Sequence, residues 1–598
     1  MLQARVALTP QLPAYRESVG KDLPWREWTW SQVGAAVQQW RCALQQSGVV
    51  HGARVGIWLS NSIHAMCMDQ AALQMGAISV PVHTTDNPAS IAYIFDNAEI
   101  SVLIVANLGQ WSRLRSTDYP MASLHTVVVV ELDAAAESDA AQGGPRVVAL
   151  ADWLQAGQAL ADAPAPGLPA AEDVAAVVYT SGTTGKPKGV MLTHANVMAD
   201  VGAFVERLHP REDDRFLSFL PLSHTFERTV GYYLAIACGA STAYARSAAL
   251  LMQDMQTEKP TILVCVPRIY ERVHAKVQEK MLAGPEAERL AFEASVEWGW
   301  ANFCARQDIA DLHKHNPALI GAPKPAAHAA IAQQIAGIFG GHVRMAITGG
   351  AAIPQSTAKM FLALDVTLLQ GYGMTETTPV ISVVTPDSND PATVGAPLPC
   401  VEIRIGEQRE LQVRGPIVMK GYWKRPEETA AAFTEDGWLR TGDQAELVKG
   451  RIRLMGRLKE IIVTSTGEKI SPADLELSLL ADPLIEQVMV LGDARPYVSA
   501  VAVVNEENWA LFAAENGWDA KDPETLRQPV VVQTMLKRLQ ALSTEFPSYA
   551  QPRSLLLTTE PWSVENQLLT PTMKVKRKQI LERYADEIDG LYGHRRGV

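Results

Sequence analysis

The run 179–190 carries the residue types that bind a polyphosphate. It contains three glycines, four Ser or Thr hydroxyls and two lysines within twelve residues. Glycines let the backbone form a concave nest of amide donors, which suits phosphate oxygens. A Walker A loop needs four residues between its glycines and a hydroxyl residue after its lysine. Here two residues separate Gly182 from Gly185, and Pro187 follows Lys186, which excludes a P-loop kinase or ATPase.

Further motifs follow this run along the chain. They are Pro-Leu-Ser-His-Thr-Phe-Glu-Arg (221–228), Thr-Gly-Gly-Ala (348–351), Gln-Gly-Tyr-Gly-Met-Thr-Glu (370–376), Trp-Leu-Arg-Thr-Gly-Asp (438–443), Gly-Arg-Leu-Lys-Glu (456–460) and Thr-Pro-Thr-Met-Lys-Val-Lys-Arg (570–577). With the phosphate run, this series resembles the adenylate-forming (AMP-binding) superfamily. The similarity extends from about Trp28 to Arg577. Within the superfamily, Pro267 to Val273 and the long helical insertion after it resemble the long-chain fatty acyl-CoA synthetases.

The resemblance implies a complete ATP site. The pyrophosphate of ATP would be held by the first run, at Thr180, Ser181, Gly182, Thr183, Thr184, Gly185 and Lys188. Lys188 is favoured over Lys186 because it precedes the last glycine of the run. Adenine and the nearby phosphate would be bound by Gln370, Gly371, Tyr372, Gly373 and Thr375. The wall between acyl group and adenine would be Gly349, Gly350 and Ala351, and the ribose would be bound by Asp443 and Arg457.

The catalytic residues implied by the resemblance are Lys574, Glu376, Thr184 and Lys188. Joining a carboxylate to AMP brings two anions together, so the site must neutralise charge and align the reactants. A lysine ammonium such as that of Lys574 can bridge carboxylate and α-phosphate oxygens. Glu376 is the expected ligand of Mg²⁺, which prefers one or two carboxylates together with phosphate oxygens. Thr-Pro-Thr precedes Lys574 where most relatives have Ser-Gly, a departure that favours a fatty-acyl enzyme.

Two residues are assigned roles outside nucleotide binding. His224 is expected to line the acyl channel, and a buried core histidine is the alternative reading. Lys459 lies where the family has its hinge. By analogy, the C-terminal domain would rotate between adenylation and thioester formation.

Alternating apolar and helical stretches predict the elements that position these residues. Apolar runs at 54–59, 102–105, 173–179 and 343–347 predict buried strands of a largely parallel sheet. Alternation at 401–405 and 411–413 predicts an antiparallel pair with one solvent-facing side. We expect an α/β fold with a distorted β-barrel near 390–455. Residues 1–456 would form a large N-terminal domain of several subdomains, and 457–598 a small mobile α+β domain. The apolar stretch from Val230 to Ala245 predicts a buried helix.

Composition narrows the class of protein. A net charge of -12 and hydrophobic residues at 47% favour a globular protein and argue against a nucleic-acid partner. The six scattered cysteines suit a reducing compartment. Neither a signal peptide nor a transmembrane stretch is predicted, so we expect a cytoplasmic protein. Peripheral membrane contact and oligomeric state stay open.

The expected reaction is ATP-dependent activation of a long-chain fatty acid to acyl-AMP, followed by transfer to coenzyme A. The substrates would then be fatty acid, ATP and coenzyme A, with Mg²⁺ as cofactor. The chain stops soon after the lysine motif without a carrier domain, which favours coenzyme A as acceptor. A fatty acyl-AMP ligase that loads a separate carrier protein stays open. So does an inactive nucleotide-binding scaffold, although the residues expected for catalysis are all present.

Overall fold

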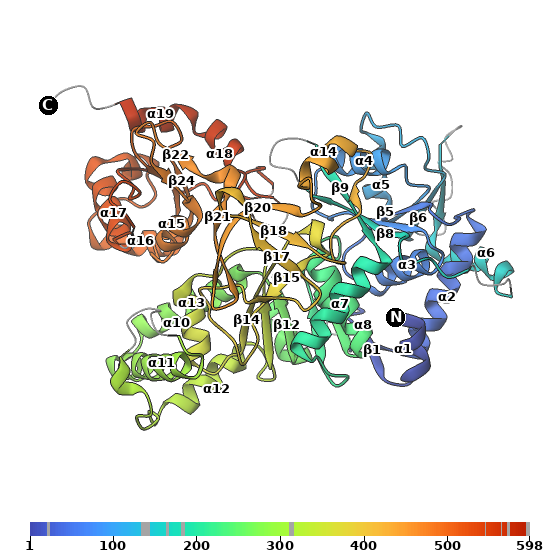
Figure 1. Cartoon of the computed structure of the whole chain (residues 1–598), viewed down its shortest axis with the longest axis horizontal. Coiled ribbons are helices and arrows are strands. Elements are labelled where there is room, and N and C mark those ends of the chain that lie inside the picture. The colour runs from blue at the N-terminus through green and yellow to red at the C-terminus, as the bar shows by residue number, and fades with distance from the viewer. Residues whose placement is uncertain are drawn as a thin grey trace.

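A computed structural model shows two lobes built around five sheets (Figure 1). It describes residues 1–598 except 21–23, 133–143, 163–166, 181–185, 310–315, 545, 564, 571–573 and 594–598. The strands β1 to β21 form the three sheets of the N-terminal lobe, and β22 to β26 form the two sheets of the C-terminal lobe. Here, the C-terminal lobe means residues from 461 onward, and residues 458–460 connect it to β21. The mixed α/β class and the smaller C-terminal part are confirmed.

An eight-stranded sheet carries the first candidate motif. Its order is β19-β9-β8-β4-β3-β5-β6-β7, and the pairs from β8 to β7 are parallel. The parallel strands are rich in β-branched residues because helices cover both of their faces. The bounds are β3 Arg54–Trp58, β4 Ile78–Pro81, β5 Val102–Asn107, β6 Thr126–Glu131, β7 Arg146–Ala149, β8 Val174–Thr180, β9 Lys188–Thr193 and β19 Gly421–Tyr422.

A nine-stranded sheet carries the glycine-rich motifs. Its order is β16-β15-β14-β13-β12-β10-β11-β1-β2, and it is parallel from β14 through to β1. The glycine motifs follow or end its parallel strands, at the carboxyl edge where α/β proteins bind ligands. The bounds are β1 Pro13–Glu17, β2 Arg26–Thr29, β10 Arg215–Ser218, β11 Ser241–Tyr244, β12 Ile262–Cys265, β13 Met345–Thr348, β14 Leu368–Gly373, β15 Val380–Val383 and β16 Ala396–Pro397.

A four-stranded antiparallel sheet occupies the region where a distorted barrel was expected. Its order is β17-β18-β20-β21, an open sheet in the part of the chain that the structure describes. The bounds are β17 Glu402–Ile405, β18 Glu410–Arg414, β20 Leu439–Val448 and β21 Arg451–Arg457. The predicted pair β17–β18 is antiparallel as expected, but its solvent-facing side is wrong for β18. Glu410 and Gln412 are buried there because their polar groups bond to each other.

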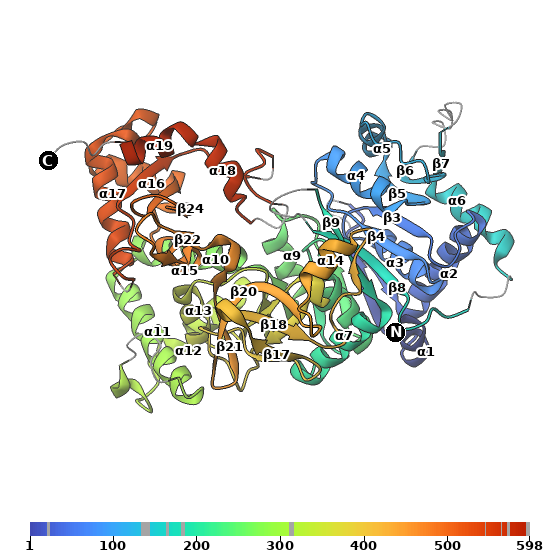
Figure 2. The same ribbon diagram turned by 45° about the horizontal axis from the view of Figure 1, so that its top comes forward.

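The C-terminal lobe contains a small two-stranded sheet and a three-stranded sheet packed between helices (Figure 2). The bounds are β22 Ile462–Val463, β23 Lys469–Ile470, β24 Ile485–Leu491, β25 Ser499–Val504 and β26 Ser554–Thr558. Its helices are α15 Pro472–Leu479, α16 Glu506–Glu515, α17 Pro529–Leu542, α18 Arg577–Arg583 and α19 Ala585–Gly593. The boundary expected after residue 456 stays a prediction.

Helices cover the two large sheets and build the insertion predicted near 271–340. Those of the first half are α1 Leu2–Leu8, α2 Trp30–Gln46, α3 Ile63–Gln74, α4 Pro88–Ala98, α5 Leu108–Arg115, α6 Leu150–Gly157, α7 His194–Leu208 and α8 Leu234–Cys238. The next are α9 Leu251–Glu258, α10 Pro267–Ala283, α11 Glu286–Arg306, α12 His328–Ile338, α13 Gln355–Ala363 and α14 Pro426–Ala432. None of the helices in the described residues is both long and apolar enough to cross a bilayer.

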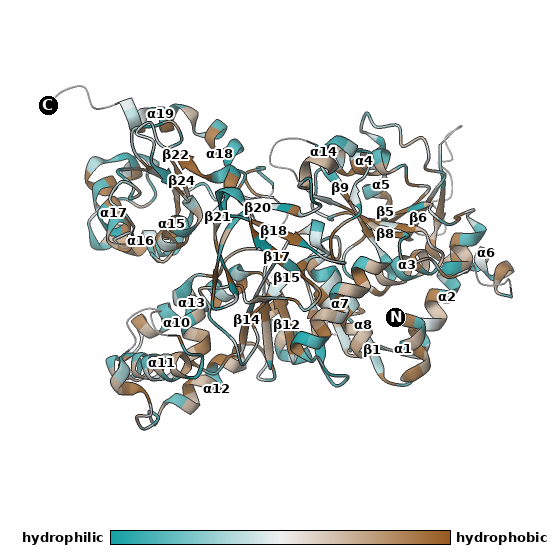
Figure 3. Cartoon of the chain, in the orientation of Figure 1, coloured by the Kyte–Doolittle hydropathy of each residue, from teal (hydrophilic) through white to brown (hydrophobic). Residues whose placement is uncertain are grey.

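The single buried helix expected from Val230 to Ala245 is wrong in its second half. A π-helix spans Glu227–Tyr233, α8 ends at Cys238, and the chain then enters β11. Gly239 ends the helix with φ +82°, a left-handed conformation that glycine adopts at little cost. Both α8 and β11 are largely buried, so hydrophobicity alone did not separate helix from strand. Figure 3 shows the hydropathy of the residues in α8 and its neighbours.

Candidate active site

Two strands bring the ends of the phosphate run together. Thr180 is the last residue of β8 and Lys188 the first of β9, and the two are register partners in an antiparallel pair. The predicted ligands Ser181, Gly182, Thr183, Thr184 and Gly185 lie between them, outside the described residues. The structure therefore places Thr180 and Lys188, the residues on either side of these predicted ligands.

Lys188 is held by an acidic residue that sequence reasoning missed. Its Nζ lies 2.5 Å from Oε2 of Glu428, near the start of α14, and 5.2 Å from the centroid of the Tyr422 ring. Arg425 approaches the other carboxylate oxygen of Glu428 at 2.5 Å. These two cations lower the pKa of Glu428, so its carboxylate is ionised at neutral pH. Lys188 thus has an anionic partner that a phosphate could replace.

Glu376 has a fixed orientation. It lies in a short 3-10 helix, Thr375–Thr377, and its Oε1 accepts a hydrogen bond of 2.7 Å from the hydroxyl of Tyr422. Its backbone carbonyl accepts a bond of 2.8 Å from the amide of Met419. Pairing of β19 with β9 places Tyr422 opposite Val190, which is why a tyrosine far along the chain reaches this carboxylate.

A magnesium ion fits Glu376 as a single protein carboxylate. Across the described part of the chain, no three His, Cys, Asp or Glu side chains converge to form a metal cage. Mg²⁺ keeps several waters and binds through one or two carboxylates plus substrate phosphates, so a lone oriented carboxylate is a sufficient protein contribution. The donor set therefore suits a metal that arrives with a nucleotide.

Asp443 joins the two strands that precede the C-terminal lobe. It lies on β20 directly opposite Arg457, the last residue of β21, and the Arg457 Nε is 3.1 Å from its Oδ1. The Tyr372 hydroxyl donates a bond of 2.5 Å to its Oδ2. Burial raises the pKa of Asp443, while Arg457 and Tyr372 oppose that shift. Three residues predicted to bind the nucleoside are thus in direct contact.

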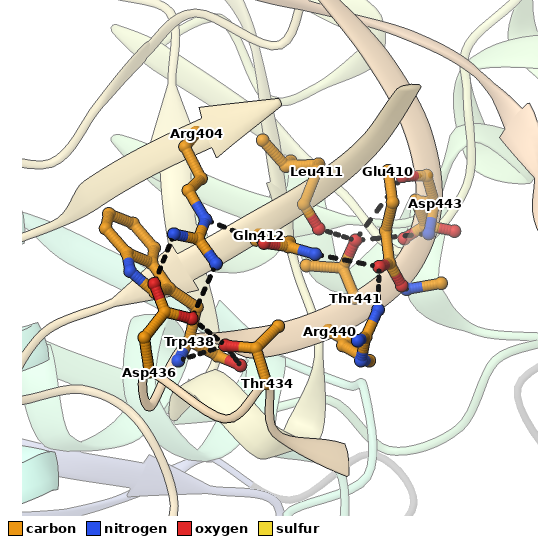
Figure 4. A network of polar contacts seen from close by, with 11 residues as sticks. Arg404, Glu410, Leu411, Gln412, Thr434, Asp436, Trp438, Arg440, Thr441 and Asp443 are labelled. Atoms are coloured by element: carbon orange, nitrogen blue, oxygen red, sulfur yellow. Dashed lines mark hydrogen bonds and ion pairs between the residues drawn. The ribbon is translucent and has the colours of Figure 1, made fainter. Parts of the chain in front are cut away.

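A polar network holds the backbone around Asp443 (Figure 4). The Thr441 hydroxyl donates to the Leu411 carbonyl at 2.7 Å and accepts from the Asp443 amide at 3.1 Å. Glu410 accepts from the Gly442 amide at 3.3 Å and from Arg440 at 3.0 Å. The turn carrying Asp443 is therefore fixed by β18 independently of any ligand, a form of preorganisation.

The glycine-rich motifs allow close backbone contacts. A Cβ on Gly349 would lie 3.2 Å from the Phe226 ring and 3.4 Å from the Gly371 carbonyl. A Cβ on Gly373 would lie 1.8 Å from the Pro379 carbonyl, so only glycine fits there. Gly350 and Ala351 follow Gly349 at the surface, beyond the end of β13.

Gln370 ties this wall to the neighbouring loops. Its side-chain oxygen accepts from the Ile353 amide at 3.3 Å, and its side-chain nitrogen donates to the Thr393 carbonyl at 3.3 Å. Thr375 accepts a backbone bond from Thr378 at 3.3 Å, which closes the turn that carries Glu376. These contacts are structural, so nucleotide contacts by Gln370 and Thr375 stay predictions.

Lys574 reaches this site from the C-terminal lobe. Its amide donates to the Thr570 hydroxyl at 3.0 Å and its carbonyl accepts from the Thr570 amide at 2.8 Å. Desolvation and the charge of Arg457 lower the pKa of Lys574, while Asp443, Glu460 and Glu376 oppose this shift. The lysine therefore lies in the electrostatic field of the residues predicted to bind ribose and magnesium.

His224 lies within the electrostatic field of Lys574. Burial, followed by the charge of Lys574 and by His83, lowers the pKa of His224 to about 4. Burial also raises the pKa of Asp86 to about 6, against the charge of Lys576. His224 is thus neutral at pH 7. His83 and Asp86 were missed because nothing in their local sequence marks them.

Lys459 lies in the connection between the lobes. It is part of a short 3-10 helix, Leu458–Glu460, between β21 and β22. The position agrees with that of a linker, and its action as a hinge stays a prediction. The structure thus brings Asp443, Arg457 and Tyr372 into contact. Tyr422 is bonded to Glu376 and lies near Lys188, and the charges of Arg457, Asp443 and Glu376 act on Lys574.

Known proteins similar to this chain agree with the motif series. Long-chain-fatty-acid–CoA ligase FadD15 of Mycobacterium bovis is 29% identical, covering 96% of this chain and 93% of that protein. The chloroplastic long-chain-fatty-acid–[acyl-carrier-protein] ligase AEE15 of Arabidopsis thaliana is 28% identical, covering 94% of this chain and 82% of that protein.

A solved structure shows the same fold. The didomain of carboxylic acid reductase from Segniliparus rugosus, in complex with AMP, superposes with a TM-score of 0.75 at 23% identity. The match covers 99% of this chain and 81% of that chain.

The family models cover both lobes. The AMP-binding enzyme model matches residues 2–423, and the AMP-binding enzyme C-terminal domain model matches residues 459–596. The resemblance expected from the motifs is confirmed. With more than half of its length matched by one model, the chain belongs to the AMP-binding enzyme family.

Proposed function

We propose that this enzyme activates a long-chain fatty acid with ATP and transfers the acyl group to coenzyme A. A carboxylate oxygen attacks the α-phosphorus of ATP, the bond to the β-phosphate oxygen breaks, and pyrophosphate leaves. The sulfur of coenzyme A then attacks the acyl carbon, the bond to the AMP oxygen breaks, and the thiol proton passes to solvent. Acyl-CoA, AMP and pyrophosphate are the products.

The observation that carries this proposal is the contact of Asp443 with Arg457 and Tyr372, in whose electrostatic field Lys574 lies. Lys574 offsets the negative charge that gathers as the carboxylate approaches the α-phosphate. Asp443 accepts hydrogen bonds from the ribose hydroxyls, and the charge of Arg457 opposes the rise that burial causes in the pKa of Asp443. Glu376 would hold Mg²⁺, which supplies positive charge to the phosphates when bound.

The remaining predicted residues are assigned by the same argument. Lys188 and the run Thr180, Ser181, Gly182, Thr183, Thr184 and Gly185 bind the pyrophosphate. The adenine contacts are Gln370, Gly371, Tyr372, Gly373 and Thr375. Gly349, Gly350 and Ala351, with neutral His224, separate the acyl channel from the nucleotide. Lys459 is the hinge between domains 1–456 and 457–598.

The names of the relatives support a long-chain fatty acid as substrate. They support two acceptors of the acyl group, coenzyme A and a carrier protein. FadD15 is named a long-chain-fatty-acid–CoA ligase. AEE15 is named a ligase for an acyl carrier protein, so a carrier protein is the alternative acceptor. All six cysteines lie in the described residues and are free thiols, which supports a reducing cytoplasm as the compartment.

The test separates the half-reactions. Wild-type enzyme, Lys574→Ala and Lys578→Ala are given Mg²⁺-ATP, coenzyme A and fatty acids of increasing length, and acyl-AMP, AMP and acyl-CoA are measured. Lys578 is the matched control, since it is a solvent-exposed lysine on α18. We expect Lys574→Ala to lose acyl-AMP formation by at least a hundredfold, as for removal of a transition-state charge partner.

The outcomes are distinct. Lys574→Ala should still transfer the acyl group from supplied acyl-AMP to coenzyme A. Acyl-AMP without acyl-CoA in the wild type would favour the carrier protein as acceptor. Absence of acyl-AMP with every fatty acid would refute the proposed substrate class.

A further inference from the structure

An ion pair joins the two lobes outside the residues assigned above. Arg268 belongs to the 267–273 motif that resembles the long-chain enzymes, and it is the second residue of α10. Its Nη2 donates to Oε1 of Glu486 on β24 at 2.6 Å, and its Nη1 donates to the backbone carbonyl of Glu486 at 3.1 Å. Both views show α10 beside the C-terminal lobe (Figures 1 and 2). The side chains are 27% and 34% exposed, so the pair is partly shielded from solvent.

Two features of the C-terminal lobe orient the side chain of Glu486. The β24–β25 register shifts between Ile485 and Gln487, so Glu486 lies in a β-bulge. A bulge re-aims the side chain and removes the residue from the regular ladder. The Asn505 side chain donates to Oε2 of Glu486 at 2.9 Å, which leaves Oε1 directed toward Arg268.

Arg268 is poorly suited to its place in α10 without Glu486. The amino end of a helix carries a partial positive charge, so a cation in the first turn is unfavourable. Pro267 begins the helix, and no acidic residue lies in its first turn. Glu486 supplies the missing negative charge from the other lobe. Glu271 of α10 also attracts Arg268 electrostatically, while the direct ion pair of Arg268 is made with the other lobe. A first-turn cation that is paired across the lobes points to a functional constraint.

We propose that the Arg268–Glu486 ion pair is a latch that holds the C-terminal lobe in the adenylation orientation. The latch is formed in the structure in which Lys574 lies in the field of Asp443 and Glu376. Arg268 is therefore a positioning residue, which acts through Lys574 and does not touch the reactants. This inference rests on the proposed function. Rotation of the lobe for thioester formation would require the latch to open.

The first experiment measures each half-reaction in latch variants. Arg268→Ala and Glu486→Gln should each slow acyl-AMP formation about tenfold, the effect of losing a partly exposed charge-assisted contact. Transfer from supplied acyl-AMP to coenzyme A should be unchanged or faster, because the open orientation becomes more populated. A merely structural defect would lower both half-reactions together.

A charge-reversed double variant and a matched control test whether the effect depends on this ion pair. Arg268→Glu combined with Glu486→Arg should restore acyl-AMP formation to within about threefold of wild type, because a glutamate also suits a helix amino end. Arg289→Ala removes a similar arginine, which pairs with Glu293 at 2.8 Å within α11. This control should leave both half-reactions unchanged.

A second measurement needs no substrate and so stands apart from the proposed function. Trypsin cuts after arginine and lysine, and Arg457 and Lys459 lie in the connection between the lobes. Cleavage there should be faster in Arg268→Ala and return to the wild-type rate in the charge-reversed enzyme. This result would support the latch whichever acid is the substrate.

Two outcomes would overturn the latch. One is equal loss of both half-reactions in Arg268→Ala, and the other is no change in either half-reaction or in cleavage between the lobes. Failure of the charge-reversed pair to recover, while each single variant is impaired, would also count against it.

Discussion

Glu428→Gln should strengthen the binding of ATP. Glu428 holds Lys188 at 2.5 Å. The proposed function requires this lysine to turn toward the pyrophosphate when the nucleotide binds. The Lys188–Glu428 ion pair therefore competes with the binding of ATP. Glutamine keeps the shape of the side chain and removes the charge that restrains Lys188.

The expected gain in ATP affinity follows from the exposed fractions of the Lys188 and Glu428 side chains. The two side chains are each 34% exposed, so the ion pair is screened by solvent and contributes about 0.2–1 kcal/mol. Release of Lys188 should thus tighten nucleotide binding by between about 1.4-fold and about fivefold. Arg425 would be freed from Glu428 at the same time and adds positive charge near the site.

The assay is calorimetric titration with an ATP analogue that cannot be cleaved between its α- and β-phosphates. Wild type, Glu428→Gln, Lys188→Ala and the double variant form a double-mutant cycle. The gain from Glu428→Gln should vanish when Lys188 is absent. Weaker binding by Glu428→Gln would refute the reasoning, because it would mean that Glu428 orients Lys188 for the ligand instead of competing for it.

Three further changes have defined outcomes. Tyr422→Phe removes the 2.7 Å hydrogen bond that orients Glu376. The Mg²⁺ concentration for half-maximal activity should therefore rise about fivefold in a titration with the metal. An unchanged Mg²⁺ requirement would contradict the proposed role of Glu376. Asp69→Ala leaves the buried Arg228 cation without its ion-pair partner. The free energy of unfolding of the N-terminal lobe, measured with denaturant, should fall by about 3–5 kcal/mol. A loss below about 1 kcal/mol, the range of exposed ion pairs, would show that the Asp69–Arg228 pair does not behave as a buried one. Burial raises the pKa of Glu227 to about 8, so the folded protein keeps a proton that the unfolded chain releases near pH 4.5. Stability should therefore fall by about 1.4 kcal/mol per pH unit between those values. Glu227→Gln should flatten this slope in melting temperatures taken from pH 5 to 8, and parallel slopes would reject the assignment.

The fold was predictable where each element carries its own pattern. The runs at 54–59 and 102–105 became β3 and β5 because β-branched residues suit strands buried on both faces. The prediction for 230–245 failed because the stretch is mostly apolar and largely buried, so its periodicity could not separate helix from strand. Only Gly239 marked the change, and its meaning depends on the left-handed conformation seen in the structure.

The site was predictable where one motif contains both the residue and its context. Glu376 and Asp443 could be identified from neighbouring glycines and threonines. Tyr422 and Glu428 could not, because their contacts depend on the β9–β19 pairing of distant segments. The bond from Tyr372 to Asp443 is another case, since each residue belongs to a different sheet.

Each of the six hydrophobic clusters found in the described residues lies wholly within one lobe. Reorienting the C-terminal lobe would therefore leave every apolar core intact, and the balance between orientations would depend on charged contacts. Charges at a surface are screened over about 8 Å at physiological ionic strength, whereas apolar burial is nearly insensitive to such salt. If the proposed latch governs the orientation of the C-terminal lobe, a change in ionic strength should shift the balance between the two half-reactions without changing the stability of either lobe.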